Sequence, residues 1–125
     1  MVTGSRPQDA GLRTLRLPLG AYASILHRVT GLLLLMVIAS GLVLLRLSLR
    51  DPQHFATVGA WILAPTGRAL GSMAVWVAAQ HLYGGIRHML LDTGRGWGRT
   101  RSRQSAAGVL ILALVTAVLA GLLWP

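Results

Sequence analysis

Two histidines and an arginine lie within an otherwise apolar run from His81 to Asp92, which reads HLYGGIRHMLLD. Ionisable side chains in hydrocarbon are costly and rare, and they usually serve a function. His81 and His88 are seven positions apart, so both project from one face of a helix. Gly84 and Gly85 between them leave a gap on that face. The pattern indicates a site for a flat cofactor.

The same helix face continues as a stripe of small residues and histidines, formed by Gly67, Gly71, Ala74, Ala78, His81, Gly85 and His88. Small residues let membrane helices approach closely, so a packing seam with two hydrogen-bonding histidines is the alternative interpretation. The opposite side carries large groups suited to lipid, namely Trp76, Tyr83, Ile86 and Leu90. We therefore expect the stripe to face protein or a cofactor.

Haem is the natural candidate for this face, because neutral imidazole is its commonest axial ligand from protein. The chain has no cysteine, which excludes disulfides and thiolate metal sites within it. Seven helical residues separate His81 from His88 by about 10.5 Å along the axis. Two axial ligands must reach opposite sides of one iron, so one helix cannot supply both. A second ligand would come from His27 or from a partner subunit.

A second polar cluster opens the first apolar run, in the segment SILHRVTG from Ser24 to Gly31. Ser24 and Arg28 are four apart and share a helix face, with His27 beside Arg28. An arginine could pair with haem propionates, and a serine with an arginine could hold a quinone carbonyl. The competing interpretation is an arginine that extends from a helix end toward water.

The composition requires a membrane environment for these clusters. Of 125 residues, 54% are hydrophobic and the mean hydropathy is +0.61. Three apolar runs, at 24–45, 69–91 and 106–124, are each long enough to cross a bilayer, which needs about 20 residues. The sequence predicts an all-α integral membrane protein with three transmembrane helices. The net charge of +9 does not indicate nucleic-acid binding, because the arginines flank the apolar runs.

The arginines also predict the orientation. Seven precede the first run or lie between the second and third, at positions 6, 13, 16, 95, 99, 101 and 103, whereas three lie between the first and second, at 46, 50 and 68. The positive-inside rule then places segment 1–20 in the cytoplasm and Pro125 outside, with 21–125 as the three-helix membrane domain. Region 46–66 could hold a short interfacial helix, and His54 is expected to be a solvated loop histidine. We expect Gly94 to Gly98, GRGWG, to form a flexible turn.

The paired motifs SILHRVTG and HLYGGIRHMLLD, the approach LRLPLGAYA and the order of three spans resemble one family from Leu15 onward. This family is the cytochrome b membrane-anchor subunit of succinate dehydrogenase, respiratory complex II. The resemblance implies a second small three-helix anchor subunit as partner. It also implies an iron-sulfur subunit and a soluble flavoprotein carrying FAD, both held at the membrane by the two anchor subunits. An N-terminal region without a convincing transit peptide favours a bacterial inner membrane.

The resemblance also implies residue roles. His81 would be an axial ligand of haem b, with the other ligand from the partner anchor subunit. His27 and Arg28 would lie near the propionates, and Ser24 and Arg28 would border the quinone site. Arg87 and His88 are motif residues for which propionate contact is plausible. Many relatives carry an Arg-Pro-Leu-Ser-Pro-His-Leu stretch near the N-terminus, of which only Arg6-Pro7 remains here.

The expected function is therefore to anchor a succinate:quinone oxidoreductase, bind haem and complete its quinone-reduction site, without succinate chemistry in this chain. A membrane scaffold without a cofactor is the alternative. A small transporter is a third option, but the helices lack the paired broken segments and midplane acids expected of one.

Overall fold

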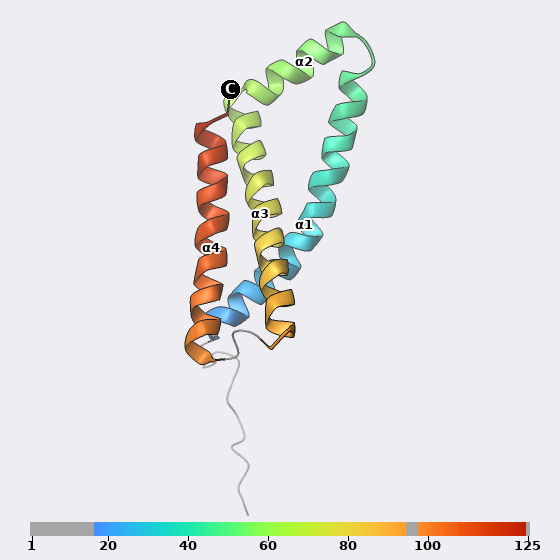
Figure 1. Ribbon diagram of the computed structural model, residues 1–125. Helices are drawn as coiled ribbons and strands as arrows, with labels where there is room; N and C mark the ends of the chain where they lie inside the picture. Colours follow the sequence, from blue (N-terminus) through green and yellow to red (C-terminus); the bar gives the residue numbers. More distant parts are fainter. Residues whose placement is uncertain (1–16, 95–97, 125) are drawn as a thin grey trace, which may run out of the picture.

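The computed structural model describes residues 17–94 and 98–124, and this part of the chain is helical throughout, with short connections (Figure 1). The helices are α1 (Leu19–Ser48), α2 (Pro52–Leu63), α3 (Pro65–Asp92) and α4 (Arg99–Leu122). The start of α1, the end of α3 and the start of α4 lie at one end of the bundle, and α2 crosses the other end. Helices at all three apolar runs are confirmed. The α1 and α3 helices extend beyond their runs at both ends, whereas α4 begins seven residues before its run and ends two residues short of it.

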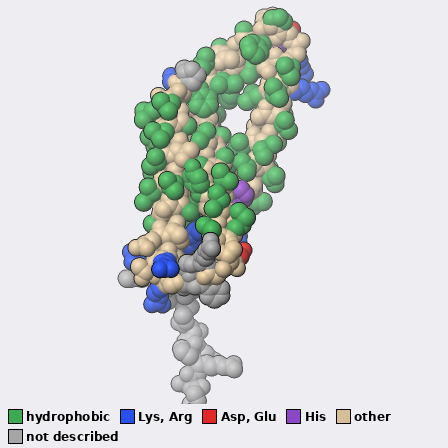
Figure 2. Space-filling view, viewed as in Figure 1, with side chains coloured by type: hydrophobic (Ala, Val, Ile, Leu, Met, Phe, Trp, Pro, Cys, Tyr) green, Lys and Arg blue, Asp and Glu red, His purple; other side chains and the backbone are tan. Residues whose placement is uncertain are grey.

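Two of these helices, α1 and α4, are each long and apolar enough to cross a membrane. The α2 and α3 helices meet that condition only as a pair, bent by 74° at their junction. Large apolar side chains cover much of the outer surface, including Leu32, Met36 and Leu119 (Figure 2). A helical bundle with an apolar exterior satisfies its backbone polar groups internally, as lipid requires.

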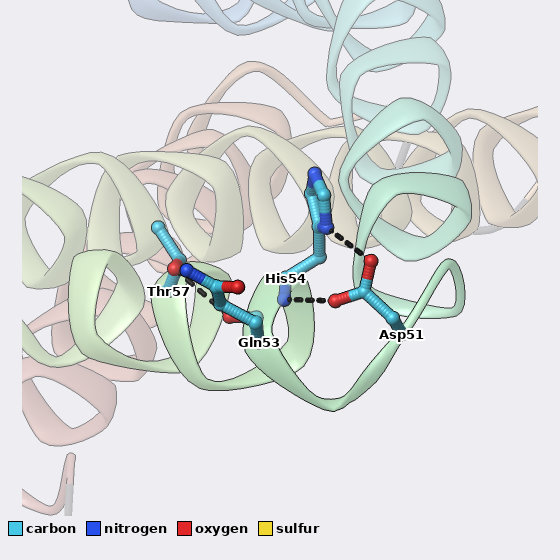
Figure 3. A network of polar contacts seen from close by, with 4 residues as sticks. All are labelled: Asp51, Gln53, His54 and Thr57. Atoms are coloured by element: carbon cyan, nitrogen blue, oxygen red, sulfur yellow. Dashed lines mark hydrogen bonds and ion pairs between the residues drawn. The ribbon is translucent and has the colours of Figure 1, made fainter.

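The predicted helix within 46–66 is confirmed as α2. Asp51 is its N-cap residue, and Pro52 is its first helical residue. Proline suits the first helical position because its missing N–H would have no partner there. The Asp51 carboxylate caps the helix by accepting from the backbone N–H of His54 at 2.8 Å. Its second oxygen contacts Nδ1 of the His54 ring, also at 2.8 Å, and the Thr57 hydroxyl donates to the Gln53 carbonyl (Figure 3). His54 is exposed, as expected of a solvated histidine, but the expected loop position was wrong because His54 lies in the first turn of α2.

A sharp corner joins α2 to α3 at Ala64 and Pro65. Pro65 starts the new helix, and the backbone of Ala64 is extended. Gly67 sits against the carbonyl oxygens of Trp61 and Ile62 so closely that any Cβ there would overlap them. Glycine at this position is therefore what allows α3 to turn back so tightly under α2.

The bundle core is made of small side chains and a few polar ones. Its buried members are Ala23 and Thr30 of α1, Val77, Ala79, Gln80, Gly84 and Arg87 of α3, and Ala106, Val109, Ala113 and Ala117 of α4. Small residues let the three helices pack closely. No residue of α1 from 31 to 48 is buried, and α1 diverges from α3 toward α2 in Figure 1. The first half of α1 is thus the part held by the bundle.

The expected division of α3 into a small-residue face and a lipid face was partly wrong. The Tyr83 hydroxyl shares a hydrogen bond with Thr116 of α4 at 3.1 Å, so Tyr83 faces protein. Within the stripe, Gly71 packs under the ring of Trp124, beyond the end of α4, whereas Ala78 is exposed. The stripe therefore meets different neighbours along its length, with Trp124 at Gly71 and α1 at the histidine end.

Candidate functional site

The structure brings three of the four histidines together where α1 crosses α3. The rings of His27 and His81 stack with centroids 4.3 Å apart and planes 17° apart. The ring of His88, two turns further along α3, lies 5.1 Å from that of His27. All three are partly exposed at the surface of the isolated chain. We call His27, His81 and His88 the histidine cluster.

A hydrogen bond fixes the form of the His81 imidazole. Its Nδ1 lies 3.1 Å from the backbone carbonyl oxygen of His27. A carbonyl can only accept, so Nδ1 carries the proton and donates it. The neutral ring then has its lone pair on Nε2, and this is the form in which histidine binds a metal.

The gap at Gly84 and Gly85, which we expected to admit the edge of a cofactor, is filled by the ring of His27. A Cβ on Gly84 would lie 3.0 Å from Nδ1 of His27, and one on Gly85 would lie 3.3 Å from its Cε1. On α1, a Cβ on Gly31 would lie 3.0 Å from Cε1 of His81. These glycines let the two helices approach until the imidazoles stack.

The histidine cluster can supply one ligand to a haem iron, but it does not form a metal site from protein side chains alone. In the described ranges, no group of three or more His, Cys, Asp or Glu side chains is placed to hold a metal ion. Stacked rings present their nitrogens side by side and not toward one point. His81, with its lone pair on Nε2, nevertheless has the donor chemistry that haem iron requires of one imidazole.

Ser24 and Arg28 lie on α1 within one helical turn of His27. Arg28 is exposed and Ser24 is half-buried. Since both side chains share one helix face, they can act on the same ligand. Arg28 directly follows His27 in sequence, but its exposed side chain leaves α1 about 100° around the helix from that of His27.

Arg87 points elsewhere, toward α4. Its Nε donates to Oγ of Ser105 at 3.1 Å, and its Nη2 donates to Oγ of Ser102 at 3.2 Å. The side chain is only 6% exposed. In this arrangement the Arg87 hydrogen bonds join α3 to α4, and none of them reaches the histidine cluster.

Sequence reasoning missed two buried polar residues beside the cluster. Gln80 is fully buried, and neither its Oε1 nor its Nε2 has a hydrogen-bond partner among the described residues. The Nδ1 atom of His27 is also buried and has no hydrogen-bond partner among the described residues. Thr30, also fully buried, donates to the Leu26 carbonyl at 2.7 Å. A glutamine directly before His81 in an apolar run was the available signal, because burying an unpaired amide is costly.

Comparison with known proteins identifies the family. The family model for the succinate dehydrogenase/fumarate reductase transmembrane subunit matches residues 3–120. The succinate dehydrogenase cytochrome b556 subunit of Paracoccus denitrificans is 30% identical over 123 residues, covering 92% of each chain. The subunit of the same name from Coxiella burnetii is 27% identical, covering 96% of this chain and 97% of the relative. The succinate dehydrogenase hydrophobic membrane anchor subunit of Archaeoglobus fulgidus is 25% identical, covering 80% and 83%.

The family model covers both polar clusters, the α1, α2 and α3 helices, and α4 up to residue 120. The chain therefore belongs to the family of succinate dehydrogenase/fumarate reductase transmembrane subunits.

Proposed function

We propose that this chain is the haem b-binding membrane-anchor subunit of a succinate:quinone oxidoreductase and that it forms part of the quinone-reduction site. The observation that carries the proposal is the hydrogen bond from Nδ1 of His81 to the His27 carbonyl, because it leaves Nε2 as a ligand. The names of two relatives, which are cytochrome b556 subunits, support haem as the cofactor.

In this proposal His81 would bind the haem iron through Nε2, and the partner anchor subunit would supply the second ligand. The His27 and His88 rings lie beside this position, and together with Arg28 they would hold the propionates by charge-assisted hydrogen bonds. Arg87 would need another side-chain rotamer to join them, since its guanidinium is bonded to α4. Bound haem would supply one-electron redox chemistry at this site.

Ser24 and Arg28 are the proposed quinone-binding residues. The Ser24 hydroxyl can donate to one quinone carbonyl oxygen, and the Arg28 cation stabilises the negative charge that gathers on that oxygen during reduction. Arg28 is exposed and Ser24 is half-buried, so a neighbouring subunit could cover both side chains and complete the quinone site. The iron-sulfur subunit would cover this end and deliver the electrons.

The proposed setting is a bacterial inner membrane. Three spans, with 1–20 in the cytoplasm, would place Ser24, Arg28 and the histidine cluster toward the cytoplasmic leaflet. The chain would bind a second three-helix anchor subunit, and the pair would anchor the iron-sulfur subunit and the flavoprotein. Succinate oxidation would take place in the flavoprotein, so this chain is not catalytic alone.

Substitution of Arg28 tests the quinone assignment. In the assembled complex, Arg28→Ala should reduce succinate-to-quinone activity about 100-fold or more, as loss of a stabilising donor does. Succinate oxidation with an artificial acceptor should be unchanged. The control is Arg46→Ala, an exposed arginine at the other end of α1. Quinone reduction at the wild-type rate in Arg28→Ala would remove Arg28 from the site.

One observation favours a second candidate function, a scaffold without a cofactor. The ring of His27 fills the gap at Gly84 and Gly85, so the histidine cluster already packs α1 against α3 within this chain. In that case His81 would be a structural hydrogen-bond donor only. The two functions differ in the visible spectrum of the assembled complex.

A further inference from the structure

A groove runs along the outer side of the bundle between the end of α3 and the start of α4. It has a volume of about 530 Å³, and its lining includes Tyr83, Arg87, Leu90, Arg101, Gly108 and Leu112. We propose that this arginine groove binds an anionic phospholipid, with the phosphate at the arginines and an acyl chain along the apolar part. The proposal requires only that the chain lies in a membrane and is independent of haem and quinone.

The first argument is charge. Arg87 is almost fully buried, and the partners given above are the neutral oxygens of Ser102 and Ser105. The one ion pair within the described ranges is that of Asp51 with His54, at the opposite end of the bundle. A buried cation without a counter-charge is costly in lipid, and an anion at this position would offset that cost. Arg101 adds a second, exposed cation to the same groove.

The second argument is the shape of the apolar part. Gly108 forms part of the wall, and a Cβ built there would meet nothing within 4 Å, so the space above it is open. Leu90 and Leu112 flank that space. From Arg101 to Leu112 the groove follows α4 for about 16 Å at 1.5 Å per residue. Cations at one end and hydrocarbon along the rest match a phospholipid and not a free inorganic anion.

The third argument is the side of α3 on which the groove opens. At 100° per residue, Tyr83 and Leu90 lie about 200° and 180° around α3 from His81. The groove therefore opens on the side of α3 opposite the histidine cluster. A partner subunit that covers the histidines would leave the groove facing lipid.

A second groove between the same helices provides an internal comparison. It has a volume of about 560 Å³ and lies nearer the other end, where its lining includes Met73, Trp76 and Val118 and no charged residue. Lipid chains can fill either groove, but only the arginine groove can select a headgroup by charge.

The test uses the purified, fully assembled complex, with bound lipid measured by native mass spectrometry. The probes are phosphatidylglycerol and phosphatidylcholine with identical acyl chains. Wild type should retain phosphatidylglycerol at least about fivefold better than phosphatidylcholine. Arg101→Gln should reduce this retention about fivefold, and Gly108→Leu should abolish it by filling the open space.

Two matched variants serve as controls. Arg103→Gln removes an exposed arginine of α4 that is outside the groove lining, and Val118→Leu enlarges a residue of the uncharged groove. Both should bind phosphatidylglycerol as wild type does. Equal retention of the two lipids by wild type, or equal effects of Arg101→Gln and Arg103→Gln, would overturn the proposal. If 5 mM inorganic phosphate, about the intracellular range, displaced the lipid fully, the groove would be a phosphate site and the proposal would also fail. Should Gly108→Leu not assemble, Arg101→Gln decides, because that side chain is exposed.

Discussion

The imidazole rings of His27 and His81 lie face to face, 4.3 Å apart, at the point where α1 crosses α3. The contact depends on Gly84, whose missing side chain makes room for the His27 ring. The same approach of the two helices brings the His27 carbonyl within hydrogen-bonding distance of His81. The distance between α1 and α3 at this crossing therefore controls the hydrogen bond that leaves Nε2 of His81 free to bind a metal.

Gly84→Ala should weaken haem retention. The added methyl group would lie 3.0 Å from Nδ1 of His27 and would force the ring and α1 away from α3. The bond that holds the proton on Nδ1 of His81 would then lengthen, and loss of such an outer contact typically lowers metal affinity about 10- to 100-fold. The measurement is haem per assembled complex after dialysis. Gly41→Ala, which meets open space on α1, is the control and should retain full haem. Equal haem in both variants would contradict the linkage.

Gln80→Leu should stabilise the subunit. A buried amide without partners costs about 1–3 kcal/mol, and leucine of similar size removes that cost. The expected gain is an increase of about 1–3 kcal/mol in the free energy of unfolding, measured by titrating the purified subunit with denaturing detergent. Gln104→Leu, an exposed change on α4, should alter stability by less than about 0.5 kcal/mol. A loss of stability in Gln80→Leu would mean that water or another group satisfies the amide.

Both of these predictions concern contacts that the sequence did not determine. The length and composition of the apolar runs predict the helices at 24–45, 69–91 and 106–124, because a long apolar run in lipid has to be helical. The seven-residue spacing predicts that His81 and His88 share a face. Neither pattern shows which neighbouring helix covers a given face. Tyr83 was for this reason assigned to lipid, but it forms a hydrogen bond with Thr116 of α4.

The gap at Gly84 and Gly85 was recognised from the sequence, but its occupant was not. A glycine gap accepts any flat ring, and the choice between a cofactor and His27 depends on the crossing angle of two helices, which the sequence does not give. The cap of α2 could have been predicted, because Asp51 followed by Pro52 is a common helix start. Gly94, two residues after the end of α3, lies in a turn with φ of +77°, and residues 95–97 of the expected turn lie outside the described residues.

Asp51→Ala should fray the first turn of α2. The backbone N–H of His54, and then its ring, hold the pKa of the Asp51 carboxyl below its ordinary value. The cap is therefore fully present above that ordinary value and is lost as pH falls through the lowered pKa. At neutral pH, amide hydrogen exchange at His54 and Phe55 should be faster in Asp51→Ala than in wild type. Wild type should lose this protection only in acid, after correction for intrinsic rates. Gln53→Ala, in the same turn, should exchange as wild type does, and equal protection in Asp51→Ala would show that the cap is dispensable.

The most direct test of the central claim, that His81 binds haem iron, is the reduced-minus-oxidised visible spectrum of the purified, fully assembled complex. We compare wild type with His81→Leu, and His54→Leu is the control because His54 lies at the other end of the bundle. The account predicts a b-type haem band in wild type and in His54→Leu, and a lost or strongly altered band in His81→Leu. An identical band in all three complexes, or no band in wild type, would contradict it.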